Sequence, residues 1–93
     1  MEPQFMMISA ASCVLQFMNH NHMAIDEEIY QNLSDYIQQG RIEDEKIIQG
    51  MIAAGTIALK LKRKSGHKIT DKQILQEIMK EIPRIHEELS EEL

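Results

Sequence analysis

Apolar residues are densest over residues 47–61, which read IIQGMIAAGTIALKL. No Asp, Glu, Lys or Arg occurs between Ile47 and Leu59, and the apolar positions run almost all the way round a helical wheel. A helix that is apolar on most sides has to be covered on most sides. The pattern therefore predicts a central buried helix, at about residues 42–64, around which the rest of the chain packs.

Small residues form a face of this central helix. Gly50, Ala54 and Ala58 are spaced four apart, so they share one side of the helix. Gly50 and Gly55 each cost about 1 kcal/mol in helix propensity relative to Ala, which suggests that close packing or a bend offsets the cost. We expect another helix, the first of the chain, to lie against this small-residue face.

The first predicted helix covers about residues 4–18 and contains no charged residue. Its polar residues Ser9, Ser12 and Gln16, followed by Asn19, form one narrow stripe. A surface helix usually has an apolar face and a charged back, and this segment lacks the charged back. It is therefore either a second buried helix or a helix that meets another subunit.

A third helix is predicted at about residues 26–39. Asp26 is a favourable N-cap residue, and the next two residues are acidic, which the helix dipole favours at this end. Gly40 is suited to the left-handed position that ends many helices. We expect the chain to leave the helix there and turn toward the central helix.

The last predicted helix runs over about residues 70–90. Thr70 and Gln73 have the spacing of a capping box at its start. Its apolar residues follow spacings of three and four, which is a heptad-like seam. Pro83 lies inside the seam without shifting its phase, so we expect either a kinked helix or two short helices nearly in line. The residues of the seam are Leu75, Ile78, Ile82, Ile85 and Leu89.

These elements predict an all-α fold, a small four-helix bundle formed by residues 1–93 as one domain. The chain has 93 residues, of which 43% are hydrophobic, and strand-forming residue types are scarce. A chain of this length buries only about 60% of its unfolded surface. A core of this size cannot easily bury two helices that are apolar all round, so we expect a homodimer or a bound partner to cover the excess.

Cys13 is the only cysteine, which makes an internal disulfide impossible and favours a reducing, cytoplasmic compartment. The apolar N-terminal segment lacks a basic region and a cleavage site, so no signal peptide is expected. The two apolar runs are shorter than the roughly 20 residues that cross a membrane, so we expect no membrane contact.

Charge is distributed unevenly along the chain. Residues 60–72 contain six basic residues and one acidic residue, whereas the segments on either side are acidic. One interpretation is a solvated helix end. Alternatives are contact with an acidic partner or a DNA-binding helix-turn-helix over residues 60–76. The residues that would contact an acidic protein or nucleic acid are Lys60, Lys62, Arg63, Lys64 and Lys68.

No motif points to catalysis. His20 and His22 would need further metal ligands, and no suitably spaced residues supply them. Cys13 has no base nearby in the sequence. Gly50 and Gly55 lie within a predicted helix and lack the Lys-Ser/Thr that follows in a phosphate-binding loop. We therefore expect no enzymatic activity, no metal and no cofactor.

The pattern as a whole favours a protein-binding regulator, adaptor or inhibitor that acts through apolar helix faces as a homodimer. The partner is another protein, a second copy of the chain, or both. The expected contact residues belong to the first and last helices: Phe5, Ile8, Leu15, Met18, Ile78, Ile82, Ile85 and Leu89.

Overall fold

Four helices make up the regular structure in a computed structural model that describes residues 3–66 and 68–91. No strand occurs within these residues, so the all-α prediction is confirmed. The helices are α1 (Pro3–His20), α2 (Asp26–Gln39), α3 (Glu45–Ser65) and α4 (Asp71–Glu91).

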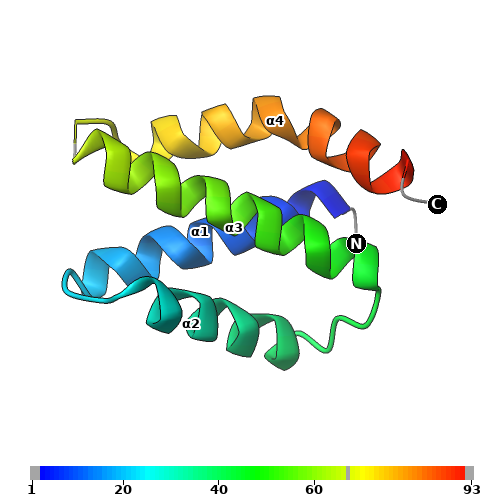
Figure 1. The fold of residues 1–93 in the computed structure, drawn as a ribbon, viewed down its shortest axis with the longest axis horizontal. Helices are drawn as coiled ribbons and strands as arrows, with labels where there is room; N and C mark the ends of the chain where they lie inside the picture. The colour runs from blue at the N-terminus through cyan, green and yellow to red at the C-terminus, as the bar shows by residue number, and fades with distance from the viewer. Residues whose placement is uncertain (1–2, 67, 92–93) are drawn as a thin grey trace.

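Two helices, α1 and α3, form the centre of the bundle. They share the most extensive interface, and α2 and α4 lie on opposite sides of this pair without contacting each other (Figure 1). The sequence predicted α3 alone as the central helix. However, the backbone of α1 comes close to all three other helices, whereas the backbones of α3 and α2 come close at few points and these two helices meet mainly through side chains. The uncharged α1 is thus a second central helix, and its buried side is formed by Met7, Ala10, Ala11, Val14 and Leu15.

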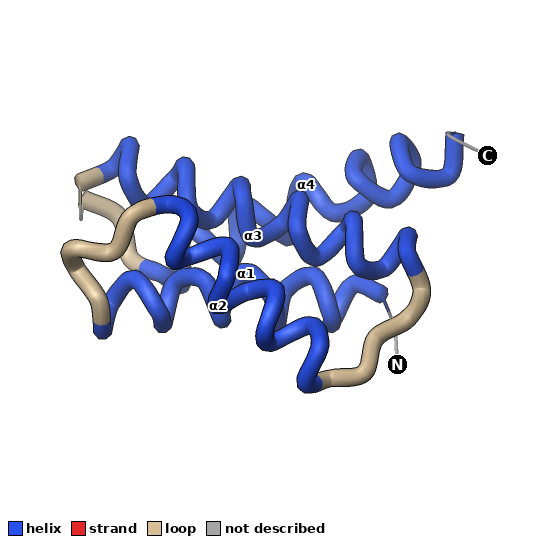
Figure 2. Tube along the Cα trace, turned by 60° about the horizontal axis from the view of Figure 1, so that its bottom comes forward, coloured by secondary structure: helices blue, strands red, loops and turns tan. Residues whose placement is uncertain are grey.

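The two ends of the bundle differ. The α1–α2 loop and the α3–α4 turn lie together at one end, and the α2–α3 loop lies at the other, as Figure 2 shows. The first end therefore gathers the C-termini of α1 and α3 and the N-termini of α2 and α4.

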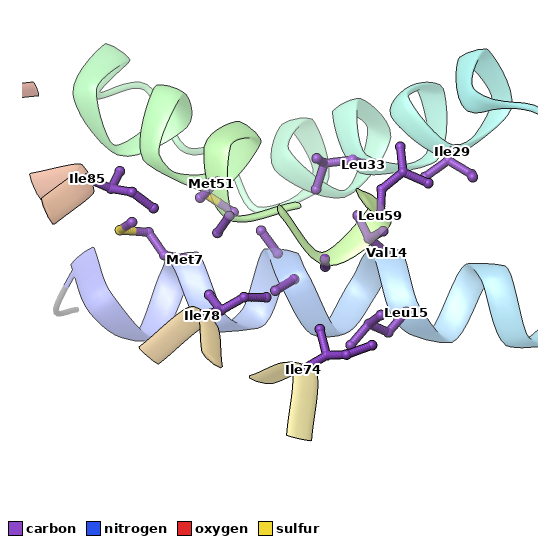
Figure 3. Packing of buried hydrophobic residues seen from close by; sticks show 14 of the residues in the cluster. Met7, Val14, Leu15, Ile29, Leu33, Met51, Leu59, Ile74, Ile78 and Ile85 are labelled. Atoms are coloured by element: carbon purple, nitrogen blue, oxygen red, sulfur yellow. The ribbon is translucent and has the colours of Figure 1, made fainter. Parts of the chain in front are cut away.

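The core is continuous and draws residues from every helix. Figure 3 shows α1 packed between α3 and α2 on one side and α4 on the other. Seven of its residues are the largest fully buried side chains: Val14, Leu15, Ile29, Leu33, Met51, Ile74 and Ile78. At about 25 cal/mol per Å² of buried apolar area, such side chains dominate the stability of a small domain.

The small-residue face of α3 lies inside the bundle, as predicted. Gly50, Ala54 and Ala58 are buried, and α1 is the main neighbour of α3. Gly55 is also closely packed. A Cβ atom added there would lie 2.8 Å from Leu33 Cδ2 and 3.1 Å from Val14 Cγ2, so glycine permits the close approach of three helices.

The boundaries of α2 differ in detail from the prediction. Ile25 is the N-cap and Asp26 is the first helical residue, because Glu28 Oε1 accepts a hydrogen bond from the Ile25 amide at 3.0 Å. At the other end, Gly40 has φ −76° and remains right-handed. The left-handed residue is the next one, Arg41, with φ 54°.

Helix α3 begins at Glu45, three residues later than predicted. Asp44 is its N-cap, and its Oδ1 accepts from the amides of Lys46 at 2.9 Å and Ile47 at 3.3 Å. These bonds satisfy amides that have no partner inside the helix. Gly66, with φ 55°, provides the left-handed C-cap.

Helix α4 has the predicted capping box at its start. The Gln73 amide donates to Thr70 Oγ1 at 3.1 Å, and the Thr70 amide donates to Gln73 Oε1 at 2.8 Å. The helix is continuous through Pro83, which excludes the alternative of two separate short helices. The kink at this proline remains a prediction.

Candidate functional site: an uncharged groove over α1

A broad hollow lies along the face of α1 that points away from the core. Its volume is about 660 Å³. Residues of α1 form most of its lining, and α2 and α4 each contribute at the sides. The lining consists of Phe5, Ile8, Ser9, Ser12, Cys13, Gln16, Phe17, His20, Asn21, Asn32, Tyr36 and Leu75.

No Asp, Glu, Lys or Arg lines this groove, although 27% of the chain is charged. Polarity comes from hydroxyl, amide and thiol groups and from the imidazole of His20, which can both donate and accept hydrogen bonds. Two contacts join α1 to α2 here. Ser9 Oγ is hydrogen-bonded to the Tyr36 hydroxyl, and Cys13 Sγ lies 3.5 Å from Asn32 Oδ1. Partial burial raises the pKa of the Cys13 thiol.

Phe5 and Ile8 are the two predicted contact residues that line this groove. Phe5 is 68% exposed, and Ile8 is half-buried. Met18 is also half-buried and lines a smaller hollow of about 250 Å³ beside Lys62 and Arg63. These three residues are accessible at least in part.

Four other predicted contact residues are in the core of the single chain. Leu15 is 1% exposed, and the three isoleucines of the α4 seam are between 0% and 4% exposed: Ile78, Ile82 and Ile85. The prediction that they face a partner is wrong, because the α4 seam packs inward on the α1–α3 pair. Leu89 lies outside the residues whose side chains are described.

The sequence did not predict that residues of α2 and α4 would line this groove. Asn32, Tyr36 and Leu75 belong to helices distant in sequence, so their position beside α1 depends on the tertiary fold. The available signal was the uncharged polar stripe of α1. That stripe was recognised, and its serines and Gln16 now form part of the groove lining.

Lys62 belongs to a polar network at one end of the bundle. Its Nζ lies 2.7 Å from Asp71 Oδ1 on α4, and only 10% of its side chain is exposed. Asn19 at the end of α1 accepts a hydrogen bond from Lys62 and donates one to Asp71 Oδ2 at 2.7 Å. The network thus joins the ends of three helices.

Arg63, the next residue, points to α2 instead. Its Nη2 lies 2.7 Å from Asp26 Oδ1 and donates to the Ala24 carbonyl at 3.2 Å. Lys62 and Arg63 therefore hold neighbouring helices of the same chain. The remaining members of the predicted basic contact set, which are Lys60, Lys64 and Lys68, are exposed.

The relation of α3 to α4 gives no support to a helix-turn-helix over residues 60–76. The two helices lie side by side and run in opposite directions over most of their length (Figure 1). In a helix-turn-helix the two helices cross at about 90–120°.

Within residues 3–66 and 68–91, no group of three His, Cys, Asp or Glu side chains is close enough to hold a metal ion. No helix in those ranges combines the length and apolar character needed to cross a bilayer.

No protein family, curated protein or solved structure matches this chain. The geometry of its surfaces is therefore the basis for a functional proposal.

A second, more apolar groove lies between α2 and α3. Its volume is about 320 Å³. Ile52 is 42% exposed at its edge, and Tyr30 is 36% exposed. The lining consists of Tyr30, Leu33, Ser34, Ile37, Gln38, Ile42, Ile48 and Ile52. The backbones of α2 and α3 come close at few points, which leaves Ile52 and Tyr30 accessible.

Proposed function

We propose that this chain is a small protein-binding regulator, adaptor or inhibitor that works as a homodimer. The copies meet at the uncharged groove over α1, and the dimer acts on another protein. The single observation that carries the proposal is that this hollow of about 660 Å³ has no Asp, Glu, Lys or Arg in its lining. Protein interfaces are depleted of charge at their centres in the same way.

The physical reason for this depletion is desolvation. Burying a carboxylate or an ammonium group against a partner costs several kcal/mol unless it is paired with an opposite charge. Hydroxyl and amide groups can exchange water for a partner at a much smaller cost, because each donates and accepts. A second α1 helix presents the same uncharged groups, so it matches the groove without leaving a charge unpaired.

Apolar side chains supply the driving force in this arrangement. Phe5 is the most exposed aromatic residue of the groove, and Ile8, Phe17 and Leu75 are half-buried. Aromatic anchors contribute heavily to binding when they enter a partner's hollow. No catalytic step forms part of the proposal. The free thiol of Cys13 in this surface is compatible with a reducing, cytoplasmic compartment.

The test uses two substitutions that add the same charge without changing side-chain volume. Gln16→Glu places a carboxylate in the groove, whereas Gln49→Glu places one on the exposed surface of α3, outside the groove lining. Light scattering of the unchanged chain is expected to give about twice the mass of 10.8 kDa. Gln16→Glu should raise the dissociation constant at least tenfold, and Gln49→Glu should leave it within about twofold.

Two results would overturn the proposal. One is a monomer at every concentration up to the millimolar range. The other is an equal response of the two variants, because the groove would then have no special part in the dimer. Circular dichroism of both variants checks that each remains folded.

A further inference from the structure

We infer that a hollow between α1 and α2, beside the loop that joins them, binds arginine or lysine side chains from a basic segment of a partner protein. The inference rests on the proposed function, because it names the chemical class of the protein on which the regulator acts. Three observations support it. The hollow has exposed apolar surface, its lining contains three carboxylates, and neither helix that forms it contains a lysine or arginine.

The apolar part of the hollow suits the stem of a long cationic side chain. The hollow has a volume of about 350 Å³. Phe17 of α1 is half-buried in its lining, and Ile25, the N-cap of α2, is 57% exposed there. Arginine and lysine pack their aliphatic stems on such surfaces and keep the charged end in water. The guanidinium group of arginine also stacks on aromatic rings.

Three carboxylates in the same lining receive the charged end. Glu27, Glu28 and Asp35 all belong to α2 and are exposed. Glu28 Oε1 accepts from the Ile25 amide, and Asp35 Oδ1 accepts from Gln31 Nε2, each at 3.0 Å. The second oxygen of both carboxylates points to no ion pair within the described residues, and Glu27 has none there either. A guanidinium group binds carboxylates through two parallel hydrogen bonds.

The elements that form the hollow offer no lysine or arginine of their own. The chain has neither residue before Arg41, which lies beyond the end of α2 and six residues after Asp35. The two histidines of this end, His20 and His22, are not in the lining. The negative charge of the lining is therefore left for a cationic segment to complement.

The cations of α3 lie on the other side of α2. Asp26 pairs with Arg63 at 2.7 Å. Tyr30 is hydrogen-bonded to α3 one turn before Lys60. These contacts mark the side of α2 that faces α3. Asp35 follows Asp26 by nine residues, which is about two and a half helical turns, so the two carboxylates point to opposite sides. Helix α4 makes no contact with α2.

A second copy of the chain is the less suitable source of the cation. A symmetric dimer at the α1 groove brings the same surface of both copies together, and α1 contains no lysine or arginine. The hollow shares Phe17 and Asn32 with that groove, but its three carboxylates lie outside the groove lining. The carboxylates thus border the proposed dimer contact, and the cation comes from a different protein.

The experiment measures fluorescence anisotropy of a short labelled peptide in which arginine and serine alternate. The control peptide has citrulline in place of every arginine, which keeps the shape of the side chain and removes its charge. We expect the arginine peptide to bind at least tenfold more tightly than the citrulline peptide. Its affinity should fall as salt is raised, because the carboxylates are exposed.

Variants of the chain locate the binding site. Glu27→Gln with Asp35→Asn removes two charges from the lining and should weaken binding at least tenfold. Glu43→Gln with Glu45→Gln is the matched control, because it removes two exposed charges outside the lining, and it should change the affinity by less than about twofold. Ile25→Ser removes apolar surface without a change of charge and should weaken binding at least threefold. Serine is a favourable N-cap, so the start of α2 is retained.

Each contrary result has a definite meaning. Equal affinity of the two peptides, or no binding at 1 mM, overturns the inference. Equal effects of the two double variants overturn it as well, since net charge alone would then explain the loss. If Glu27→Gln with Asp35→Asn dissociates the dimer, the carboxylates serve a contact between copies and the inference fails.

Light scattering separates this inference from the proposed dimer. A dimer that does not bind the arginine peptide overturns the inference and leaves the dimer standing. A monomer that binds the peptide, and loses it in Glu27→Gln with Asp35→Asn, overturns the dimer and supports the inference.

Discussion

Lys62 Nζ lies 2.7 Å from Asp71 Oδ1, and the lysine side chain is only 10% exposed. This pair joins the last turn of α3 to the first residue of α4 across the short turn between them. Asn19 adds the end of α1 to the same contact. A residue that composition assigns to a basic surface thus serves the internal structure of the bundle.

Asp71→Asn should destabilise the fold more than Asp26→Asn. Both aspartates are the first residue of a helix and both pair with a base at 2.7 Å, so loss of the helix-dipole interaction is similar in the two. The Asp26–Arg63 pair is well exposed, and its loss should cost about 0–1 kcal/mol. Loss of the Asp71 carboxylate leaves the Lys62 charge largely buried, at about 1–3 kcal/mol after allowance for solvent. Urea unfolding at pH 7 measures both, and equal costs would contradict the assignment.

Gly55→Ala should destabilise the protein despite the higher helix propensity of alanine. The gain of about 1 kcal/mol in propensity is opposed by overpacking against Leu33 and Val14, at about 1–3 kcal/mol. Leu33→Val removes the Cδ2 atom that the new methyl group would meet. In that background Gly55→Ala should become neutral or stabilising. A double-mutant cycle by urea unfolding measures the coupling, and additive effects would argue against this contact.

Asp44→Ala should cost about 1 kcal/mol, because the side chain accepts bonds from two amides at the start of α3. Glu43→Ala is the control. Glu43 lies one residue before the cap and makes no such bond within the described residues, so its replacement should change stability by less than about 0.5 kcal/mol. Thermal unfolding of the two variants distinguishes this start of the helix from the earlier one that the sequence predicted.

The pH at which the alkylation rate of Cys13 rises should be higher in the folded chain than in the unfolded chain. The thiolate is the reactive form, and burial raises the pKa of this thiol. Iodoacetamide rates measured between pH 7 and 10 should therefore rise at higher pH in the native protein than in urea. The same shift lowers stability at high pH, because the unfolded thiol ionises first as the pH increases. Coincident pH profiles of the native and the urea-unfolded protein would contradict this prediction. The Cys13→Ser variant, which lacks the thiol, measures the background labelling.

The sequence was sufficient to predict the helices, because their signals are local. The period of apolar residues, the Thr70 capping box and the long uncharged run of α3 each depend on neighbours within a few turns. The burial of Gly50, Ala54 and Ala58 followed from the same reasoning. The predicted helix boundaries were less accurate. Asp44 is the N-cap of α3, which therefore begins later than predicted, and Arg41 has the left-handed conformation expected of Gly40.

The surfaces could not be predicted in the same way. A heptad-like seam has one appearance whether it packs on its own chain or on a second one, and Ile78 and Ile82 pack on their own. The charge of residues 60–72 likewise did not distinguish Lys62 and Arg63, which have internal partners, from the exposed Lys64. The positions of the grooves depend on which helices are not closely packed against each other, and only the tertiary structure determines that.

The absence of contact between α2 and α4, and the sparse contact between α2 and α3, leave α2 attached mainly through α1. The side-chain contacts of α2 with α3 include the Asp26–Arg63 pair in the first turn, the Tyr30–Thr56 hydrogen bond and the packing of Leu33 on Gly55. In hydrogen exchange, α2 should therefore open as a cooperative unit at a lower free energy than the other three helices, which remain packed together. Since the groove over α1 includes Asn32 and Tyr36 of α2, occupancy of that groove would slow this opening.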